Sequence, residues 1–234
     1  MSADRKGNTK LIEIIGPAGA GKSTLALLLA KNPDVSLVDQ SPNTRRMADI
    51  PFFIIHILKL IPTLFYFYIH HKGRWLTKRE IAEMAILTGW PDLIKRQAHR
   101  NGRITLLDEG PIFIMAFLMV YGPDLIRCEM ARKWWRKIYK EWAKSLDEVI
   151  WLDASNTNLV ARIRSREKPH GVKIKSDQES FQYLDSFRKT YKEILHSLIA
   201  FAPEISVRQF DTSQVSMSQI TRRIAAELSI TRSN

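Results

Sequence analysis

One stretch near the N-terminus constrains the fold of this chain more than any other feature. It reads Gly16-Pro17-Ala18-Gly19-Ala20-Gly21-Lys22-Ser23 and is followed by Thr24. This is the G-x-x-x-x-G-K-[ST] pattern of a phosphate-binding loop, or P-loop. The apolar run 11–15 predicts a buried strand before the loop, and 24–31 predicts a helix whose positive N-terminal end faces the phosphates. We therefore predict that the chain binds a nucleoside triphosphate.

Each contact expected from this loop follows from its residue types. Lys22 would reach the β- and γ-phosphates as a point charge, and the Ser23 hydroxyl would ligate Mg²⁺. The glycines let backbone N–H groups turn inward around phosphate oxygens, because no Cβ stands in the way. The other positions expected to contact the nucleotide are Gly16, Ala18, Gly19, Ala20, Gly21 and Thr24.

Composition narrows the fold class and the partners. A chain of 234 residues with 45% hydrophobic content suits one medium α/β domain with a real core. The net charge of +12 favours anionic partners such as nucleotides, phosphorylated substrates, nucleic acid or an acidic membrane surface. Cys128 is the only cysteine, so no internal disulfide can form and we expect a reducing cytoplasm. The first ten residues are polar, and no apolar signal-peptide core is expected to follow them.

A second strand, predicted at 35–38, ends directly before Asp39. Ligands of a parallel α/β sheet lie outside the carboxyl ends of its strands, so Asp39 could act as a general base or bind an acceptor hydroxyl. A turn-forming aspartate is the equal alternative. Arg45 and Arg46 follow, and they could hold an anionic acceptor or simply be exposed to solvent.

The segment 50–69 is apolar and almost long enough to cross a bilayer. His56, Lys59 and Pro62 argue against a membrane span. A basic run at 70–79 follows, as at a cytoplasmic membrane face. We favour a buried helical wall of an acceptor pocket, and interfacial membrane binding is the second interpretation.

The next helix and strand lead to a second acidic site. Thr77 and Glu80 predict a capping box, and Gly89-Trp90-Pro91 predicts a helix break, with a second helix running to about residue 100. A buried strand at 103–107 ends in Asp108-Glu109, the Walker B arrangement, in which Asp108 would hold Mg²⁺ directly or through water. Glu109 could help the metal, orient a nucleophile or pair with an arginine.

The C-terminal half predicts two more strands and a basic lid. Helices are expected at 112–121, 124–144, 177–200 and 217–228, and strands at 148–152 and 205–210. The helix 124–144 interleaves basic residues with tryptophans, which we interpret as an amphipathic helix rather than a nucleic-acid or membrane surface. Arg162 and Arg166 lie in a cationic segment, 162–177, that predicts a mobile lid neutralising charge on a transferring phosphoryl group. A solvated basic loop is the alternative.

Together these features resemble the thymidylate kinase and deoxynucleoside kinase group of P-loop phosphotransferases. The likeness rests on the P-loop, Asp108-Glu109, the lid arginines and the run Phe210-Asp211-Thr212-Ser213-Gln214. It implies a three-layer fold with a five-stranded parallel sheet flanked by helices, Mg-ATP as donor and an acceptor pocket roofed by helices. It also implies that Asp39 is the acidic residue after the second strand and that the loop beginning at Asp211 lies against the adenine.

Two departures from that group lie on the acceptor side. Thymidylate kinases commonly carry Asp-Arg where this chain has Asp108-Glu109, and a Glu-Pro-Gly-Gly type loop where this chain has Asp39-Gln40-Ser41-Pro42. The resemblance as a whole predicts an ATP- and Mg²⁺-dependent kinase of a nucleoside monophosphate or nucleoside, and the two departures keep other acceptors open. A kinase of a sugar or lipid-linked acceptor and an ATP-hydrolysing regulator are the alternatives.

The expected organisation is a single domain, 1–234, in which 50–100 forms a helical acceptor region. The expected partner is a small-molecule phosphate acceptor and no specific nucleic acid, with Asp39, Arg45, Arg46 and Glu109 as acceptor-binding residues. A homodimer and a peripheral membrane contact through 50–79 stay open.

Overall fold

The computed structural model describes residues 10–38, 41–70, 73–101 and 104–230. Asp39 lies outside the described residues. The strands are β1 (Lys10–Ile15), β2 (Val35–Val38), β3 (Ile104–Asp108), β4 (Glu148–Asp153) and β5 (Ser206–Asp211). They form one five-stranded sheet in the order β2-β3-β1-β4-β5, and every neighbouring pair is parallel. This confirms the predicted five-stranded parallel sheet flanked by helices.

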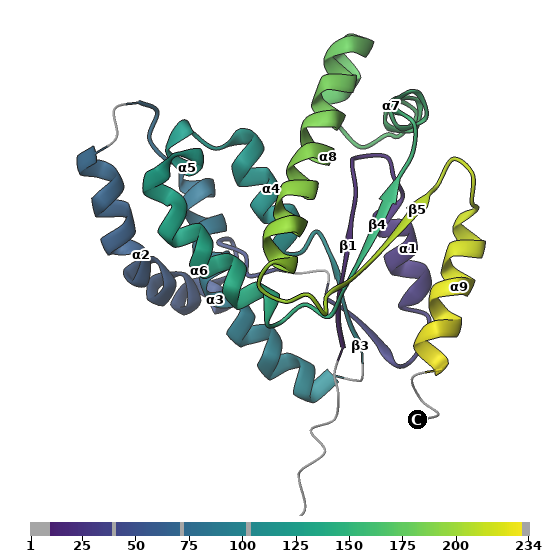
Figure 1. Ribbon diagram of the computed structural model, residues 1–234, viewed down its shortest axis with the longest axis horizontal. Helices are drawn as coiled ribbons and strands as arrows, with labels where there is room; N and C mark the ends of the chain where they lie inside the picture. Colours follow the sequence, from purple (N-terminus) through teal and green to yellow (C-terminus); the bar gives the residue numbers. More distant parts are fainter. Residues whose placement is uncertain (1–9, 39–40, 71–72, 102–103, 231–234) are drawn as a thin grey trace, which may run out of the picture.

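Helices cover both faces of the sheet (Figure 1). On one side lie α1 (Lys22–Leu29), α7 (Asn156–Arg164) and α9 (Met217–Ile230). On the other lie α3 (Lys78–Asn101), α4 (Pro111–Tyr121), α6 (Arg132–Ala143) and α8 (Asp177–Ile199). Because side chains alternate along a strand, Leu11 and Ile15 of β1 enter the core under α3, α4, α6 and α8, whereas Ile12 and Ile14 enter the core under α1, α7 and α9.

The helix α2 (Ile50–His70) packs against α3 at the outer edge of the molecule, far from the sheet (Figure 1). The predicted capping box at the start of α3 is confirmed. The Thr77 N–H donates to Glu80 Oε2 at 2.7 Å, and the Glu80 N–H donates to Thr77 Oγ1 at 3.2 Å.

The predicted helix break at Gly89-Trp90-Pro91 is wrong, because α3 continues through Pro91 to Asn101. Proline has no N–H to give the carbonyl one turn earlier, which here belongs to Leu87. That carbonyl accepts instead from Trp142 Nε1 of α6 at 3.0 Å, within the protein interior. Trp90 packs edge-on against the same indole, at 5.9 Å between ring centroids. A tertiary hydrogen bond therefore replaces the helical one.

The single helix predicted at 124–144 is also wrong. The structure has α5 (Asp124–Arg127), a 3₁₀ turn η2 (Glu129–Ala131) and then α6. The backbone is extended at Cys128, and the Trp135 indole of α6 donates to the Ile126 carbonyl at 2.7 Å. The amphipathic interpretation of α6 is correct, because Trp134, Trp135 and Trp142 are buried and its basic residues face outward.

Two short 3₁₀ turns remain, one within the predicted lid and one before α2. The 3₁₀ turn η3 (Gly171–Ile174) lies between α7 and α8, and a further 3₁₀ turn, η1 (Met47–Asp49), leads into α2. Ser176 caps α8 with a capping box completed by Glu179. The start of α8 is therefore fixed directly after the basic segment.

Candidate active site

The loop between β1 and α1 has the backbone that a P-loop requires. Gly16 and Gly21 have φ angles of 145° and 94°, which favour glycine. A Cβ on Gly16 would lie 2.0 Å from the Leu152 carbonyl oxygen of β4. The Lys22 ammonium donates to the carbonyl oxygens of Gly16 at 2.8 Å and Pro17 at 3.3 Å. The lysine therefore holds the loop curled around the place where phosphates would lie.

Two carboxylates at the end of β3 face this lysine. Asp108 pairs in register with Ile14, which places it beside the start of the P-loop. Burial lowers the pKa of Lys22, and the charges of Glu109 and Asp108 oppose that shift. Glu109 has a φ of 59°, the one positive value at a non-glycine residue in the described part of the chain. Such strained backbone is concentrated at functional sites.

A third carboxyl lies behind these two. Glu13, in the middle of β1, is fully buried and accepts the N–H groups of Ile112 and Phe113 at 3.0 and 3.1 Å. Burial raises the pKa of Glu13 to about 8, and the Asp108 charge adds to that rise against the effect of the two backbone bonds. Glu13 therefore fixes the N-terminal end of α4 on the sheet.

The residues beside the P-loop fit a magnesium ion. Asp108 Oδ1 is buried and has no hydrogen-bond partner among the described residues. Ser23 lies in the first turn of α1, directly after Lys22. No group of three or more His, Cys, Asp or Glu side chains gathers in the described ranges to hold a metal. A site with few protein ligands suits Mg²⁺, which is usually held by one or two carboxylates together with substrate phosphates.

The P-loop opens into a cavity of about 800 Å³ that four groups of residues line. Its floor is Gly16, Ala18, Gly19, Gly21, Lys22, Ser23 and Thr24. Its basic rim, from the segment between α7 and α8, is Arg166, Lys168, Pro169, His170, Gly171 and Lys175. Its aromatic wall, from α4 and α8, is Phe113, Phe117, Tyr121, Tyr183, Phe187 and Tyr191. Arg79 of α3, Glu109, Ile163 and Val172 complete the lining.

Five rings of the aromatic wall, those of Phe117, Tyr121, Tyr183, Phe187 and Tyr191, form one continuous set of contacts. Tyr183 lies 5.2 Å from Phe187 and 6.4 Å from Tyr121, and Phe187 lies 6.0 Å from Tyr191. The Arg79 guanidinium lies 4.1 Å from the centroid of Phe117. The sequence analysis predicts the helix at 177–200 but not this wall. The signal was the spacing of Tyr183, Phe187 and Tyr191, which places three aromatic rings on one helical face.

Solved structures provide the comparison for this arrangement. Deoxyadenosine kinase from M. mycoides with bound dATP aligns with a TM-score of 0.51 and 19% identity, over 93% of this chain and 98% of that chain. The same kinase with bound dCTP gives 0.52 and 19%, over 94% and 98%. Its complex with the products dCMP and a flexible dCDP gives 0.52 and 17%, over 94% and 98%. This chain has the P-loop deoxynucleoside kinase fold. No family model matches the sequence, and no curated protein matches it significantly.

Within this deoxynucleoside kinase fold, most of the predicted donor-side residues come together. Of the sequence-predicted residues, those that line the cavity are Gly16, Ala18, Gly19, Gly21, Lys22, Ser23, Thr24, Glu109 and Arg166. Ala20, within the same loop, is buried in the hydrophobic core. Arg45 and Arg46 are exposed before α2 and are not among the lining residues of the cavity.

Arg162 and Asp211 lie beside the cavity rather than in its lining. The Arg162 guanidinium donates to Thr212 Oγ1 at 2.8 Å, to the Thr212 carbonyl at 2.9 Å and to the Gly19 carbonyl at 3.5 Å. It therefore joins the P-loop to the turn after β5. Asp211 Oδ1 accepts the Ser213 N–H at 2.7 Å and lines a separate polar cavity of about 710 Å³.

The basic rim also contains a histidine that sequence reasoning did not select. His170 Nδ1 accepts the Val172 N–H at 3.2 Å, and its ring meets Tyr183 at 5.8 Å. Burial lowers the pKa of His170, and the neighbouring cations Arg166, Lys22 and Lys168 lower it further. Burial and the neighbouring cations therefore both favour the neutral form of His170.

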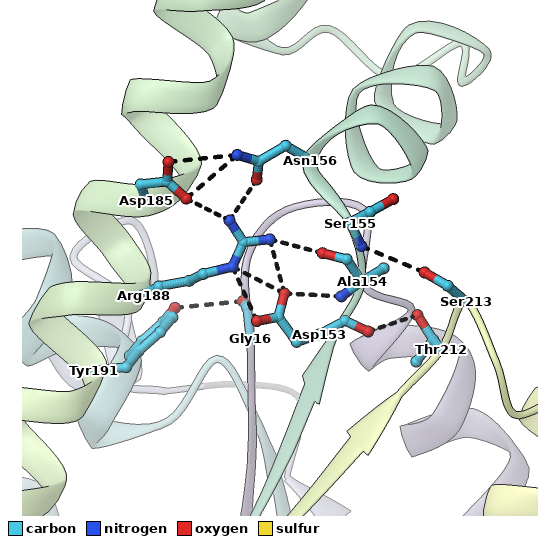
Figure 2. A network of polar contacts seen from close by, with 10 residues as sticks. All are labelled: Gly16, Asp153, Ala154, Ser155, Asn156, Asp185, Arg188, Tyr191, Thr212 and Ser213. Atoms are coloured by element: carbon cyan, nitrogen blue, oxygen red, sulfur yellow. Dashed lines mark hydrogen bonds and ion pairs between the residues drawn. The ribbon is translucent and has the colours of Figure 1, made fainter.

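A polar network ties α8, and with it part of the aromatic wall, to the sheet (Figure 2). Arg188 donates to both carboxylate oxygens of Asp153, including Nε to Oδ2 at 2.9 Å, and to the Ala154 carbonyl at 2.7 Å. Asp185 accepts from the same guanidinium. Farther along α8, the Tyr191 hydroxyl reaches the Gly16 carbonyl at 3.5 Å. The position of α8 is thereby fixed relative to the P-loop.

Proposed function

We propose that this chain is a kinase that moves the γ-phosphate of Mg-ATP to a nucleoside or nucleoside monophosphate. The observation that carries the proposal is one cavity of about 800 Å³ that brings these parts together. The P-loop and a lid arginine line it on one side, and a carboxylate and the aromatic wall line the rest. Such a cavity has room for a donor phosphate chain and a small acceptor together.

The donor half would work through charge. Lys22 stabilises negative charge on the transferring phosphoryl group, and Arg166 adds a second cation from the lid. Ser23 and Asp108 would hold Mg²⁺, which when bound screens the charge of the β- and γ-phosphates. Arg162 would act through the loop that it joins to Gly19, as a positioning residue for the nucleotide.

The acceptor half offers flat apolar surfaces together with charge. A nucleobase can stack on the rings of Phe117, Tyr183 and Phe187, because offset aromatic contacts are favourable. Arg79 and Lys175 suit an acceptor that itself carries a phosphate. Glu109, held in a strained backbone near Lys22, can accept a hydrogen bond from the hydroxyl group that is to be phosphorylated. Asp39 is proposed to share that role.

The named ligands of the structural neighbours support this acceptor class. The M. mycoides enzyme is a deoxyadenosine kinase, and its structures contain dATP, dCTP or dCMP. A sugar or lipid-linked acceptor is the second candidate, since Glu109 stands where thymidylate kinases commonly carry arginine. An ATP-hydrolysing regulator is the third.

An acceptor screen tests the proposal. The protein is incubated with Mg-ATP and nucleosides, nucleoside monophosphates, sugars or polyprenyl-linked compounds, and ADP is measured. A nucleoside or nucleotide should stimulate ADP formation strongly, and Lys22→Ala should abolish the stimulation. Lys31→Ala, which changes an exposed lysine after α1, is the matched control. ADP formation that no acceptor changes would replace the kinase proposal with ATP hydrolysis.

A further inference from the structure

The face of α2 that points away from α3 is apolar and exposed. Its large side chains include Ile54, Ile55, Leu58, Ile61, Phe65 and Ile69, and each of these six is at least half exposed. They fall on one side of the helix, opposite the buried residues, because of their spacing along it. A contiguous apolar surface of this kind marks an interaction site.

The opposite face of α2 is committed to the protein core. Phe53, His56, Leu60 and Phe67 are buried, and the His56 ring lies against Gly89 of α3. The helix is long and apolar enough to cross a membrane by length and composition. Crossing would pull these four side chains out of their packing on α3, so the geometry favours a helix lying along a surface.

The charges around α2 indicate what kind of surface that is. The helix contains no aspartate or glutamate, and Lys59 is exposed at the edge of the apolar face. Arg45 and Arg46 are exposed at its N-terminal end, where Asp49 is the one neighbouring acidic residue in the turn that leads into α2. Arg74 follows its C-terminal end but is paired with Glu80. With a net charge of +12 on the whole chain, this pattern complements anionic lipid headgroups.

The aromatic residues near the C-terminal end of α2 fit the same surface. Tyr68 is exposed and meets the exposed Trp75 edge-on at 5.8 Å. Tyrosine and tryptophan are enriched at membrane–water interfaces, where an apolar ring and a polar tip are both satisfied. The exposed Pro62 cannot donate to the Leu58 carbonyl, which costs little in a hydrated headgroup layer and more in a dry environment.

A second copy of the chain is the other occupant to consider. In a two-fold pairing of α2 with α2, centred on the middle of the helix, Lys59 of each copy would approach its equivalent. Neither helix carries a carboxylate to compensate that repulsion. The charges therefore favour an anionic membrane over self-association.

We propose that α2 docks flat in the headgroup region of an anionic membrane, with its apolar face inserted and Lys59, Arg45 and Arg46 contacting the lipid headgroups. The docked surface would end beside the active-site cavity. The Arg74 guanidinium, just after α2, donates to the carbonyl of Tyr121 at 3.0 Å, and Tyr121 lines that cavity. Docking does not depend on the proposed kinase activity, since it is measured as binding.

Vesicle sedimentation of the full chain tests the proposal. Wild-type protein should sediment with vesicles of phosphatidylcholine and phosphatidylserine, and salt should weaken this binding because it screens the basic residues. Vesicles of phosphatidylcholine alone should bind much less. Leu58→Glu should weaken binding about tenfold or more, because a half-buried leucine contact is lost and a negative charge is added.

Matched controls exist on the opposite side of the molecule. The Leu27 side chain of α1 is 63% exposed and that of Leu58 is 58% exposed. Leu27→Glu therefore makes the same change at a similarly exposed position without affecting α2. Lys59→Gln should weaken binding about fivefold, and Lys31→Gln should leave it unchanged. These changes lie at exposed positions, and circular dichroism checks that the fold is retained.

Three results would overturn the proposal. One is a wild-type protein that does not sediment with phosphatidylserine vesicles. Another is an equal loss of binding in Leu58→Glu and Leu27→Glu. The third is a dimer in analytical ultracentrifugation that Leu58→Glu dissociates in the absence of lipid binding, which would assign the face of α2 to a second copy.

Discussion

Replacing Glu13 with glutamine should change how the stability of this protein depends on pH. The Glu13 carboxyl is fully buried, and its pKa is raised from 4.5 to about 8. Between those values the native protein keeps a proton that the unfolded chain has lost. The stability therefore falls as pH rises through this window, by up to about tenfold in the unfolding equilibrium constant per pH unit.

Glutamine removes this titration at the expense of one hydrogen bond. Its single carbonyl oxygen can accept from the N–H of Ile112 or of Phe113, and its amide group faces the other donor. The loss should cost about 1–3 kcal/mol at acidic pH. Because only the wild-type protein loses stability from this site as pH rises, the two stability curves should cross between about pH 5 and pH 7.

Urea unfolding followed by circular dichroism across this pH range measures the effect. Glu204→Gln, at an exposed position before β5, is the matched control and should leave the slope of stability against pH unchanged. If wild-type protein and Glu13→Gln give parallel curves, Glu13 is ionised in the native state and our account of its burial is refuted.

The remaining predictions concern the candidate active site. Lys22→Ala should lower phosphoryl transfer about a hundredfold or more with the fold intact, and a folded variant with near wild-type turnover would contradict this. Asp108→Asn should raise the Mg²⁺ concentration needed for half-maximal rate more than it weakens ATP binding; overlapping magnesium titrations would make Asp108 structural. Arg166→Ala should lower kcat about a hundredfold with little change in nucleotide affinity. Arg164→Ala, which changes an arginine of the same segment that is not among the residues lining the cavity, is its control. An unchanged kcat for Arg166→Ala would show that Arg166 is merely solvated.

The sheet and the P-loop could be predicted because local signals set them. Apolar runs ended by Gly16, by Asp108 or by Asp153 give buried parallel strands whose carboxyl ends carry polar residues, and the structure has them there. The sequence also contained Glu13 within such a run, but its burial depends on Ile112 and Phe113, which are distant in the chain.

What sequence reasoning missed depended on tertiary contacts. The break expected at Pro91 is absent because Trp142 supplies a donor from another helix. The pocket wall expected from 50–69 is not found among the described lining residues, which come instead from α3 through Arg79 and from α4 and α8. The sequence analysis places Arg79 only in the basic run 70–79, because its position over Phe117 cannot be deduced from spacing.

The contact between Trp142 and the Leu87 carbonyl makes the residues at positions 91 and 142 dependent on each other during evolution. Pro91 is tolerated inside α3 only while an indole N–H reaches that carbonyl. Trp142→Phe keeps an aromatic ring but leaves a buried acceptor unpaired, whereas the same change beside an alanine at position 91 restores the helical donor. Substitutions at these two sites should therefore be accepted in a fixed order, proline first lost and tryptophan then free to change.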